Sequence, residues 1–509
     1  MHEKVLLINP AINPSSQRKI INSIINTTFP TSLGSLAGYL TSKGVTPIRI
    51  IDEQLNFIHD KELEQLILSL QPPRIIGLSV LTISSKRAYL LAKKIKKIDP
   101  KAVVVLGGIH PTVMPEEALR CEGVDIVVRK EGEETFAELV SAISDQKDYS
   151  KIAGISLRKN GSIAHNPDRP MIIDLDAIPP FPYHLFEENY ERYPSFGSLL
   201  TSRGCPYNCI FCSSRSVSGK QYRYFSVERI ISEIKLLVHK YNQKTIWMLD
   251  DNIAGNPSRF LKLLDAIIEA KLPEDVNFHG SMRADNINDE ILDKAKAANF
   301  KMIAFGLETG CESLMSSINK GETVNQVIEA IKKTDRKGIA VATTIIFGLP
   351  DETRKNRRDT IKTVHSLPLS SVRYNILTPY PGTPVFKMLC KKNELFIKKD
   401  WENFAVQYMW ESNDLPYVPK NNDTYELIFD TMLANLSFYL SFKGIRRAIK
   451  NSFAGGNVIK LSKRWYLSPR TIWHFMAVIA YLSCRFLHVS LKMHASKLKW
   501  FDRVHQKNL

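Results

Sequence analysis

The first 145 residues alternate between short apolar runs and longer stretches with helical periodicity. Short apolar runs between turn residues are typical of buried strands, and apolar residues three or four positions apart are typical of helices. Strands that alternate with helices form a parallel, doubly wound sheet. The predicted strands are residues 5–9, 47–51, 75–80, 103–108 and 125–128, with the clearest helices at 32–44, 85–98 and 133–143.

A second series of strands and helices begins near residue 196. It predicts a partial (β/α)6 barrel of the TIM type, whose active site lies at the carboxyl ends of its strands. The expected domains are therefore 1–145, a proline-rich linker 146–195, the partial barrel 196–390 and a basic helical region 391–509. The predicted barrel strands are 198–204, 245–251, 278–285, 302–310, 342–350 and 372–384.

Composition agrees with a folded, multidomain protein. At 509 residues the chain exceeds one ordinary core, and 44% hydrophobic with 24% charged residues are normal globular values. The net charge of +17 is concentrated at one end, because residues 441–509 hold 14 Lys and Arg against one acid, or +13. We see no secretory signal and expect a cytoplasmic protein.

The basic C-terminal region contains two apolar segments, residues 432–442 and 472–491. The longest uninterrupted apolar run of the second segment, 475–482, is far shorter than the ~20 residues that span a bilayer. Two interpretations stay open: peripheral contact of 441–509 with the inner membrane face, or a helical lid on the barrel. No nucleic-acid recognition module is present, so no nucleic-acid partner is expected.

Seven cysteines include one tight group, C-x3-C-x2-C, formed by Cys205, Cys209 and Cys212 in SRGCPYNCIFCSS. The group follows the first predicted barrel strand. Three thiolates on one loop can hold three corners of a cubane iron–sulfur cluster, whose complete ligation usually takes four cysteines. One iron would then stay open to another ligand. The alternative is zinc with a distant fourth ligand, although zinc sites usually use CxxC knuckles.

At these residues the chain resembles the radical S-adenosylmethionine superfamily, whose signature is this triplet with an aromatic residue before the last cysteine, here Phe211. The resemblance implies a [4Fe–4S] cluster whose open iron binds S-adenosylmethionine. Reductive cleavage then gives methionine and a 5′-deoxyadenosyl radical, which abstracts hydrogen from an unactivated carbon. Such chemistry belongs to the cofactors, and the protein positions them and excludes water.

Charged residues at other predicted strand ends agree with this resemblance. Besides Phe211, the residues expected to bind S-adenosylmethionine are Arg283, Glu308 and an acid of the pair Asp250 and Asp251. Arg283 can meet a carboxylate with a forked guanidinium. Each of these residues, taken singly, is also compatible with a structural salt bridge.

The N-terminal domain, with GGIHPT at 107–112 and FPTSLGSLAGYLTSKG at 29–44, resembles the cobalamin-binding subfamily of these enzymes. This resemblance implies a flavodoxin-like domain that holds cobalamin over the barrel. Ligands of doubly wound sheets bind beyond the carboxyl ends of the strands. The predicted cobalamin-binding residues are Gly77, Ser79, Gly107, Gly108 and His110.

One departure from corrinoid domains concerns the lower cobalt ligand. Their Asp-x-His-x-x-Gly motif corresponds here to Asp52–Phe57, with Gln54 and Phe57 at the His and Gly positions. We therefore predict a cob(II)alamin spectrum without nitrogen superhyperfine splitting.

The leading functional hypothesis is cobalamin-dependent methylation of an unactivated carbon in a hydrophobic small molecule, with a reductant such as flavodoxin or ferredoxin. Alternatives are an oxidative cyclase of a tetrapyrrole, a polycyclic-lipid modifying enzyme, and a non-enzymatic corrinoid or metal-binding module. A tRNA methylthiotransferase would need three further N-terminal cysteines, yet this domain has only Cys121. The catalytic residues that touch substrate are not identifiable from the sequence.

Overall fold

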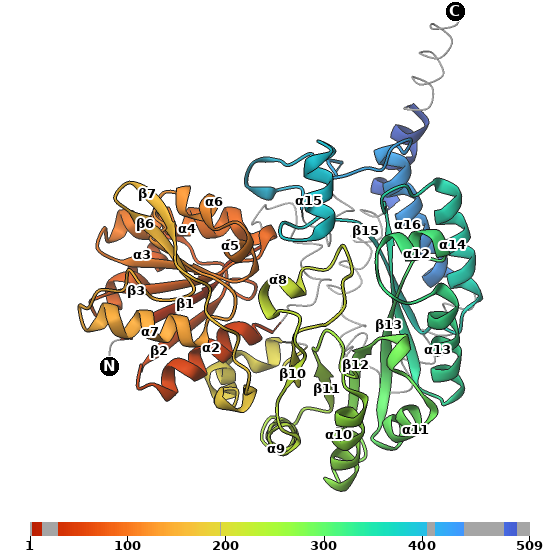
Figure 1. The fold of residues 1–509 in the computed structure, drawn as a ribbon, viewed down its shortest axis with the longest axis horizontal. Coiled ribbons are helices and arrows are strands. Elements are labelled where there is room, and N and C mark those ends of the chain that lie inside the picture. The colour runs from red at the N-terminus through yellow and green to blue at the C-terminus, as the bar shows by residue number, and fades with distance from the viewer. Residues whose placement is uncertain (1–2, 13–28, 194, 405–412, 442–482, 496–509) are drawn as a thin grey trace, which may run out of the picture.

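The computed structural model describes residues 3–12, 29–193, 195–404, 413–441 and 483–495. The described residues form two large sheets that lie beside each other, and one short two-stranded sheet (Figure 1). The first has the strand order β2-β1-β3-β4-β5-β6-β7, and its first five strands are parallel in the flavodoxin order. The predicted fold of this domain is confirmed. Its parallel strands are β1 (Val5–Asn9), β2 (Ile48–Asp52), β3 (Ile75–Ser79), β4 (Val103–Gly107) and β5 (Ile126–Val128).

Helices cover both faces of this sheet, as expected for parallel strands whose two faces are apolar. One core packs α3 and α4 against one face, and a second packs α2 and α7 against the other. The helices of the domain are α2 (Thr31–Ser42), α3 (Asp60–Ser69), α4 (Ser85–Ile98), α5 (Ile109–Val113), α6 (Pro115–Arg120) and α7 (Glu133–Ser144).

The segment predicted as a linker contains a hairpin that the sequence interpretation did not anticipate. Strands β6 (Ile155–Lys159) and β7 (Ser162–His165) extend the first sheet in antiparallel order. Arg129 fixes the hairpin to β5, because its guanidinium donates to the Ile155 carbonyl at 2.7 Å and to Asp168 at 2.9 Å.

The second sheet has six parallel strands in the order β15-β14-β13-β12-β11-β8, and this confirms the predicted partial barrel. A short antiparallel pair, β9 (Ser202–Arg203) and β10 (Arg223–Tyr224), flanks the cysteine loop. The six strands are β8 (Ser198–Leu199), β11 (Thr245–Met248), β12 (Asn277–Met282), β13 (Phe300–Glu308), β14 (Ala340–Phe347) and β15 (Ser371–Ile376).

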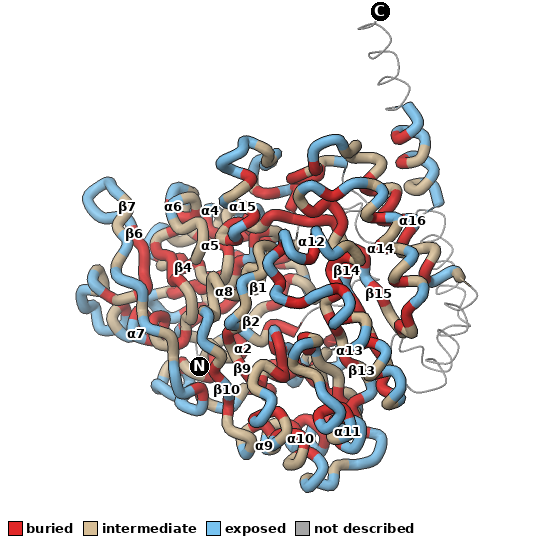
Figure 2. The backbone as a smooth tube through the Cα atoms, turned by 45° about the vertical axis from the view of Figure 1, so that its right-hand side comes forward, coloured by how far each residue is buried: buried red, intermediate tan, exposed pale blue. Residues whose placement is uncertain are grey.

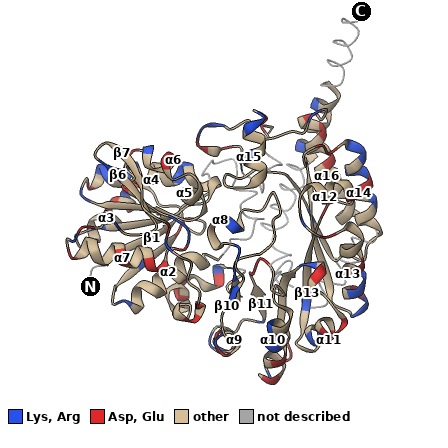
Figure 3. Cartoon of the chain, in the orientation of Figure 1, with Lys and Arg blue, Asp and Glu red and all other residues tan. Residues whose placement is uncertain are grey.

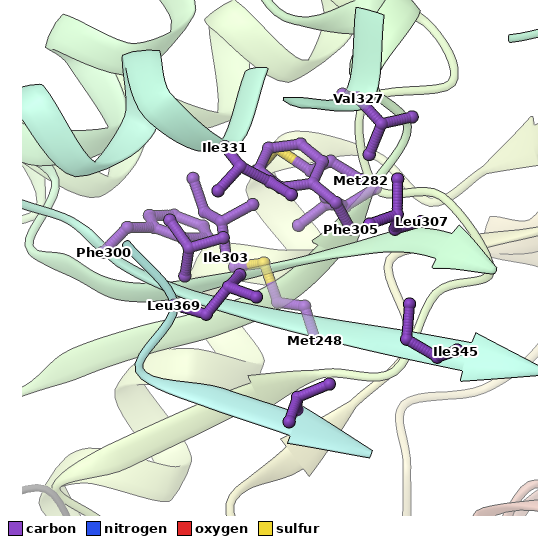
Figure 4. Close-up of a cluster of buried hydrophobic side chains, with 14 of the residues drawn as sticks. Met248, Met282, Phe300, Ile303, Phe305, Leu307, Val327, Ile331, Ile345 and Leu369 are labelled. Atoms are coloured by element: carbon purple, nitrogen blue, oxygen red, sulfur yellow. The ribbon is translucent and has the colours of Figure 1, made fainter. Parts of the chain in front are cut away.

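The outer face of this sheet forms the largest core (Figure 4). Ile303, Phe305 and Leu307 of β13 pack against Val327 and Ile331 of α13. Charged side chains lie mainly on the surrounding helices, while most of the strand surface is uncharged (Figure 3). The helices are α8 (Ser214–Ser218), α9 (Val227–His239), α10 (Pro257–Glu269), α11 (Asp289–Ala297), α12 (Glu312–Ser317), α13 (Val324–Arg336), α14 (Arg354–Ser366), α15 (Pro384–Lys391) and α16 (Thr424–Leu440).

Side chains alternate between the two faces of each barrel strand. On β14 and β15 the residues of the helix-covered face are buried, while Thr344 and Arg373 on the other face are exposed. Figure 2 shows this alternation of red and lighter segments along the strands. The inner, concave face is therefore accessible to solvent.

The described part of the C-terminal region contains α16 and the helical residues 483–495, and so confirms the predicted helical character; both helices pack on the barrel. Helix α16 covers the edge of β15, where the Tyr439 hydroxyl donates to the Val372 carbonyl at 2.7 Å. In the helical residues 483–495, Val489 is fully buried and the Phe486 ring lies 4.9 Å from that of Phe429 on α16. Most of the region predicted to touch a membrane, 442–482 and 496–509, lies outside the described residues.

Within the described ranges, no helix combines the length and apolar character needed to cross a membrane.

Candidate functional site

The cysteine loop begins immediately after β9 and ends at α8, between the two sheets (Figure 1). Backbone hydrogen bonds hold it on both sides: the Ile210 amide donates to the Ile318 carbonyl, and the Val385 amide donates to the Ile210 carbonyl, both at 3.0 Å. Gly204, at φ +87°, turns the chain into the loop, and an added Cβ would lie 2.2 Å from the Gln221 carbonyl oxygen. The loop is thus held in place by segments far apart in sequence.

Cys205, Cys209 and Cys212 are free thiols, each partly exposed. Burial raises the pKa of all three thiols, that of Cys212 to about 11, so cluster binding must displace their protons. The described residues contain no group of three His, Cys, Asp or Glu able to hold a single metal ion. A cubane cluster does not require three side chains to converge on one ion, because each thiolate binds a different iron. Three free thiols on one anchored, accessible loop fit that donor set.

The two aspartates after β11 have different environments. Asp250 is buried, and its carboxylate accepts hydrogen bonds from the Thr201 amide at 3.1 Å and the Thr201 hydroxyl at 2.9 Å. It also accepts from the Ser202 hydroxyl, so its oxygens fasten the strand that leads into the cysteine loop. Asp251 is exposed and accepts from Ser214 at the start of α8. Of the predicted pair, Asp251 is therefore the acid accessible to a ligand.

The sequence predicted that the forked guanidinium of Arg283 is free to meet a ligand carboxylate, but in the structure it is already paired with protein groups. Its guanidinium donates to Asp285 at 2.8 and 3.0 Å and to the Lys320 carbonyl at 2.9 Å. It also lies 3.4 Å from the centroid of the Tyr207 ring, inside the cysteine loop. The structure gives Arg283 a supporting position under this loop, with its charge already paired.

Glu308 ends β13 and is buried beside Lys320. The Lys320 ammonium donates to the Glu308 carboxylate at 2.9 Å, and the Thr344 hydroxyl approaches the other oxygen at 3.4 Å. Glu308 has φ +59°, a left-handed conformation that a non-glycine residue adopts at a cost. An added Cβ on Gly306 would lie 2.1 Å from a Glu308 oxygen. The chain is therefore shaped around this carboxylate, at the strand end where ligands of barrels bind.

In the first domain, Ser79 and Gly107 pair in register at the carboxyl ends of β3 and β4. A Cβ added to Gly107 would contact the Val128 carbonyl oxygen at 3.9 Å, an ordinary van der Waals distance, so a methyl group would fit there without a clash. Gly108 has φ +96°, and a Cβ added to it would lie only 2.9 Å from the Val80 backbone, so the position requires glycine. Gly77 lies within β3, and its Cβ would be 2.8 Å from Leu7. Gly77 therefore serves core packing instead of the predicted approach of a ligand.

His110 is fully buried, and its ring nitrogens face other protein groups. Nδ1 lies 3.3 Å from the Thr82 hydroxyl, and Nε2 lies 3.0 Å from the Tyr89 hydroxyl and 3.4 Å from Glu117. Trp401 packs edge-on at 5.4 Å between ring centroids. The structure therefore corrects the prediction that His110 contacts cobalamin, because its ring is enclosed by protein partners.

The segment that replaces the corrinoid motif is also engaged within the protein. Asp52 is buried, and its carboxylate accepts from the Tyr193 hydroxyl at 3.0 Å and from Asn9 at 2.9 Å. The Phe57 ring lies 4.0 Å from the Arg87 guanidinium carbon. Aromatic packing occupies the place of the motif's glycine.

An open cavity of about 400 Å³ lies between the domains, beside the strand ends of the first sheet and next to α8 and α15. Ligands of doubly wound sheets bind at such edges. Its lining residues are Thr112, Val113, Met114, Arg129, Lys130, Asp168, Ser216, Gly382, Phe386 and Lys387.

Comparison with known proteins agrees with this two-domain architecture. The pattern of the Radical SAM superfamily matches residues 199–364, and that of the B12 binding domain matches 18–140. An uncharacterized methyltransferase of Pyrococcus horikoshii is 33% identical over 409 residues, covering 79% of this chain and 86% of that protein. The chain belongs to the cobalamin-binding radical S-adenosylmethionine enzymes. The predicted [4Fe–4S] cluster, S-adenosylmethionine and cobalamin are thereby confirmed as its cofactors.

More distant relatives share the architecture. The anaerobic magnesium-protoporphyrin IX monomethyl ester cyclase of Rubrivivax gelatinosus is 27% identical over 392 residues, covering 75% of this chain and 69% of that protein. The cobalamin-dependent S-adenosylmethionine radical enzyme OxsB has a TM-score of 0.68 at 19% identity, over 99% of this chain and 75% of its own. At that identity the likeness concerns the fold alone.

The sequence analysis missed Tyr207, Lys320 and Thr344, which contact the residues predicted to bind S-adenosylmethionine. Tyr207 lies within the cysteine motif but carries no distinctive signal. Lys320 precedes α13, whose Thr323–Gln326 capping box marks the loop that presents it. Its pairing with Glu308 is a tertiary contact.

Proposed function

We propose that this enzyme methylates an unactivated carbon of a hydrophobic small molecule, using an external reductant such as flavodoxin or ferredoxin. The single observation that carries the proposal is the anchored loop with three free thiols, facing the strand ends of a cobalamin-binding domain. The name of the Pyrococcus relative, a methyltransferase, supports the same reaction. We also propose a cytoplasmic location.

In this proposal Cys205, Cys209 and Cys212 hold the cluster, and Asp251 and Glu308 contact S-adenosylmethionine. Bound together, the cofactors supply an electron that cleaves S-adenosylmethionine and a methyl group carried by cobalamin. Asp250 positions the strand that enters the cysteine loop through its bonds to Thr201. Phe211, partly buried against the core, shields the loop from water.

In the first domain, Ser79 and Gly107 would lie closest to cobalamin, because both are partly exposed at the carboxyl ends of β3 and β4. A hydrophobic substrate fits the accessible inner face of the barrel. Leu249, which directly follows β11, is 39% exposed, and Ile346 of β14 is partly exposed. These positions offer apolar contact area where the reaction is expected to occur.

The test is anaerobic reconstitution with methyl-labelled S-adenosylmethionine and a panel of hydrophobic small molecules. The proposal expects labelled product, with one 5′-deoxyadenosine and one S-adenosylhomocysteine formed for each methyl transferred. The Cys209→Ala variant should lose cluster iron and both co-products. Cys390→Ala, which removes an exposed cysteine of α15, is the matched control and should behave as the wild type.

A second candidate is oxidative cyclisation of a tetrapyrrole, favoured by the similarity to the Rubrivivax cyclase. The same incubation separates the two reactions. Cyclisation would give 5′-deoxyadenosine and an oxidised product without label, and methyl transfer would be refuted.

A further inference from the structure

The inner face of the barrel sheet carries one arginine in an unusual position. Arg373 is the third residue of β15, and both of its neighbours on the strand, Val372 and Tyr374, are 2% exposed against the helices. Arg373 itself is exposed. It pairs in register with Thr344 of β14, which is also exposed. Residues paired in register share a face of the sheet, so Arg373 extends from the inner face.

Small side chains leave room around this arginine. Ala342 of β14 and Ala304 of β13 lie on the inner face, and the Glu308 carboxylate lies over Gly306, whereas barrel interiors are usually filled by layers of bulky residues. Larger side chains lie nearer the amino ends of the strands, where the centroid of the His279 ring is 4.4 Å from that of the Trp247 ring. Among the described residues, small side chains therefore lie beside Arg373 on the inner face, and larger side chains form the layer nearer the amino ends of the strands.

Charges at the neighbouring strand ends are already paired. Arg283 binds Asp285 at 2.8 Å, and Lys320 binds Glu308 at 2.9 Å. Arg373, by contrast, makes no hydrogen bond or ion pair with any residue that the structure describes. Its register partner Thr344 contacts Glu308 at 3.4 Å, so only β14 separates Arg373 from the strand whose end carries the carboxylate proposed to bind S-adenosylmethionine.

We propose that Arg373 binds an oxyanion, a carboxylate or a phosphate, on an otherwise apolar substrate. This inference rests on the proposed function only for placing the substrate on the inner face. A guanidinium offers a planar fork that matches two oxyanion oxygens, and it stays charged at every physiological pH. Leu249 and Ile346 on the same face provide apolar contacts, so the complete surface suits a molecule with an apolar body and one anionic group.

Binding to the reconstituted holoenzyme in the presence of S-adenosylmethionine tests the proposal by calorimetry. The probes are decanoate, 1-naphthylacetate and cholate, each compared with its methyl ester, together with 1-naphthyl phosphate. Wild type should bind at least one anion about tenfold or more tightly than the matched neutral ester, as expected for a charge-assisted hydrogen bond. The acid and phosphate arms of the naphthyl probe distinguish the two oxyanions.

Arg373→Gln should abolish the preference for the anion, and Arg373→Lys should retain part of it. The control is Arg358→Gln on α14, an exposed arginine on the outer side of the barrel, which should keep the full preference. An anion preference that survives Arg373→Gln overturns the proposal. So does the failure of every anion to bind the wild type better than its ester.

A separate measurement distinguishes substrate from cosubstrate. Arg373→Gln should leave unchanged the effect of S-adenosylmethionine on the electron paramagnetic resonance spectrum of the reduced cluster. Loss of this effect would assign Arg373 to the cosubstrate and refute the proposal. Failure of the proposed function would look different, because the wild type would then yield no methylated product while the anion preference remained.

Discussion

Replacement of Arg203 by methionine should destabilise the junction between the two domains. Arg203 lies on β9, two residues before Cys205, and donates to Glu133 at 2.6 Å, to Glu131 at 3.2 Å and to Ser35 at 3.1 Å. Glu131 keeps two bonds from Arg223 at 2.8 Å, but Glu133 is left buried without a cation. Breaking one partner of a buried ion pair costs about 3–5 kcal/mol. Because Ser35 still donates to Glu133, we expect the lower end, about 3 kcal/mol.

The pH dependence gives this prediction a second signature. Burial alone would raise the pKa of Glu133, but the charge and hydrogen bond of Arg203, together with the hydrogen bonds from Ser35 and the backbone, outweigh it and hold the pKa below the ordinary value of 4.5. In the wild type this group contributes stability above that value, and the contribution is lost as the pH falls through the folded pKa. In Arg203→Met the hydrogen bonds from Ser35 and the backbone remain, but without the cation burial prevails and raises the pKa of Glu133. The variant should therefore lose stability as the pH rises above the unfolded value.

Urea unfolding of the wild type, Arg203→Met and Arg203→Met/Glu133→Gln at about pH 5 and about pH 8 measures both effects. The double variant removes the unpaired charge and should recover much of the loss, mostly at the higher pH. An Arg203→Met variant as stable as the wild type would refute the reasoning. So would a double variant no more stable than the single one.

Three further outcomes follow from the site. Burial raises the pKa of Glu352 from 4.5 to about 8, so between these pH values the folded protein holds a proton that the unfolded chain releases. The free energy of unfolding should therefore fall by up to about 1.4 kcal/mol per pH unit in this range. Glu352→Gln should flatten that part of the profile of stability against pH, and an unchanged slope would contradict the assignment. Gly107→Val adds a branched side chain beside Ser79, at the strand end where cobalamin is expected. It should lower cobalamin affinity about tenfold without loss of cluster iron, measured by cofactor content and absorbance. Full cobalamin loading would place the cofactor elsewhere. His110 is enclosed by protein partners, so the electron paramagnetic resonance spectrum of cob(II)alamin in the wild type should lack nitrogen superhyperfine splitting. His110→Gln should leave this spectrum unchanged. Imidazole coupling that is present in the wild type and lost in the variant would show that His110 binds cobalt.

Much of the architecture was predictable because its signals are local. The apolar runs and helical periods of the first 145 residues predicted all five parallel strands, and the resemblance to cobalamin-binding enzymes implied their flavodoxin-like order. The hairpin β6–β7 was missed, because two short strands between prolines and charged residues carry weak periodicity. The cysteine triplet identified the cofactor class for the same local reason, since the three thiols must lie on one loop.

What the sequence by itself determined, then, is the pair of domains, the loop that carries the thiols and the cofactor class, all of which depend on neighbours along the chain. Only the tertiary structure decided which charges are free. Asp250 is engaged by Thr201, 49 positions earlier, and Glu308 by Lys320, while Arg373 has no partner among the described residues. Pairing depends on which strand ends come together, and that follows from packing of the whole sheet.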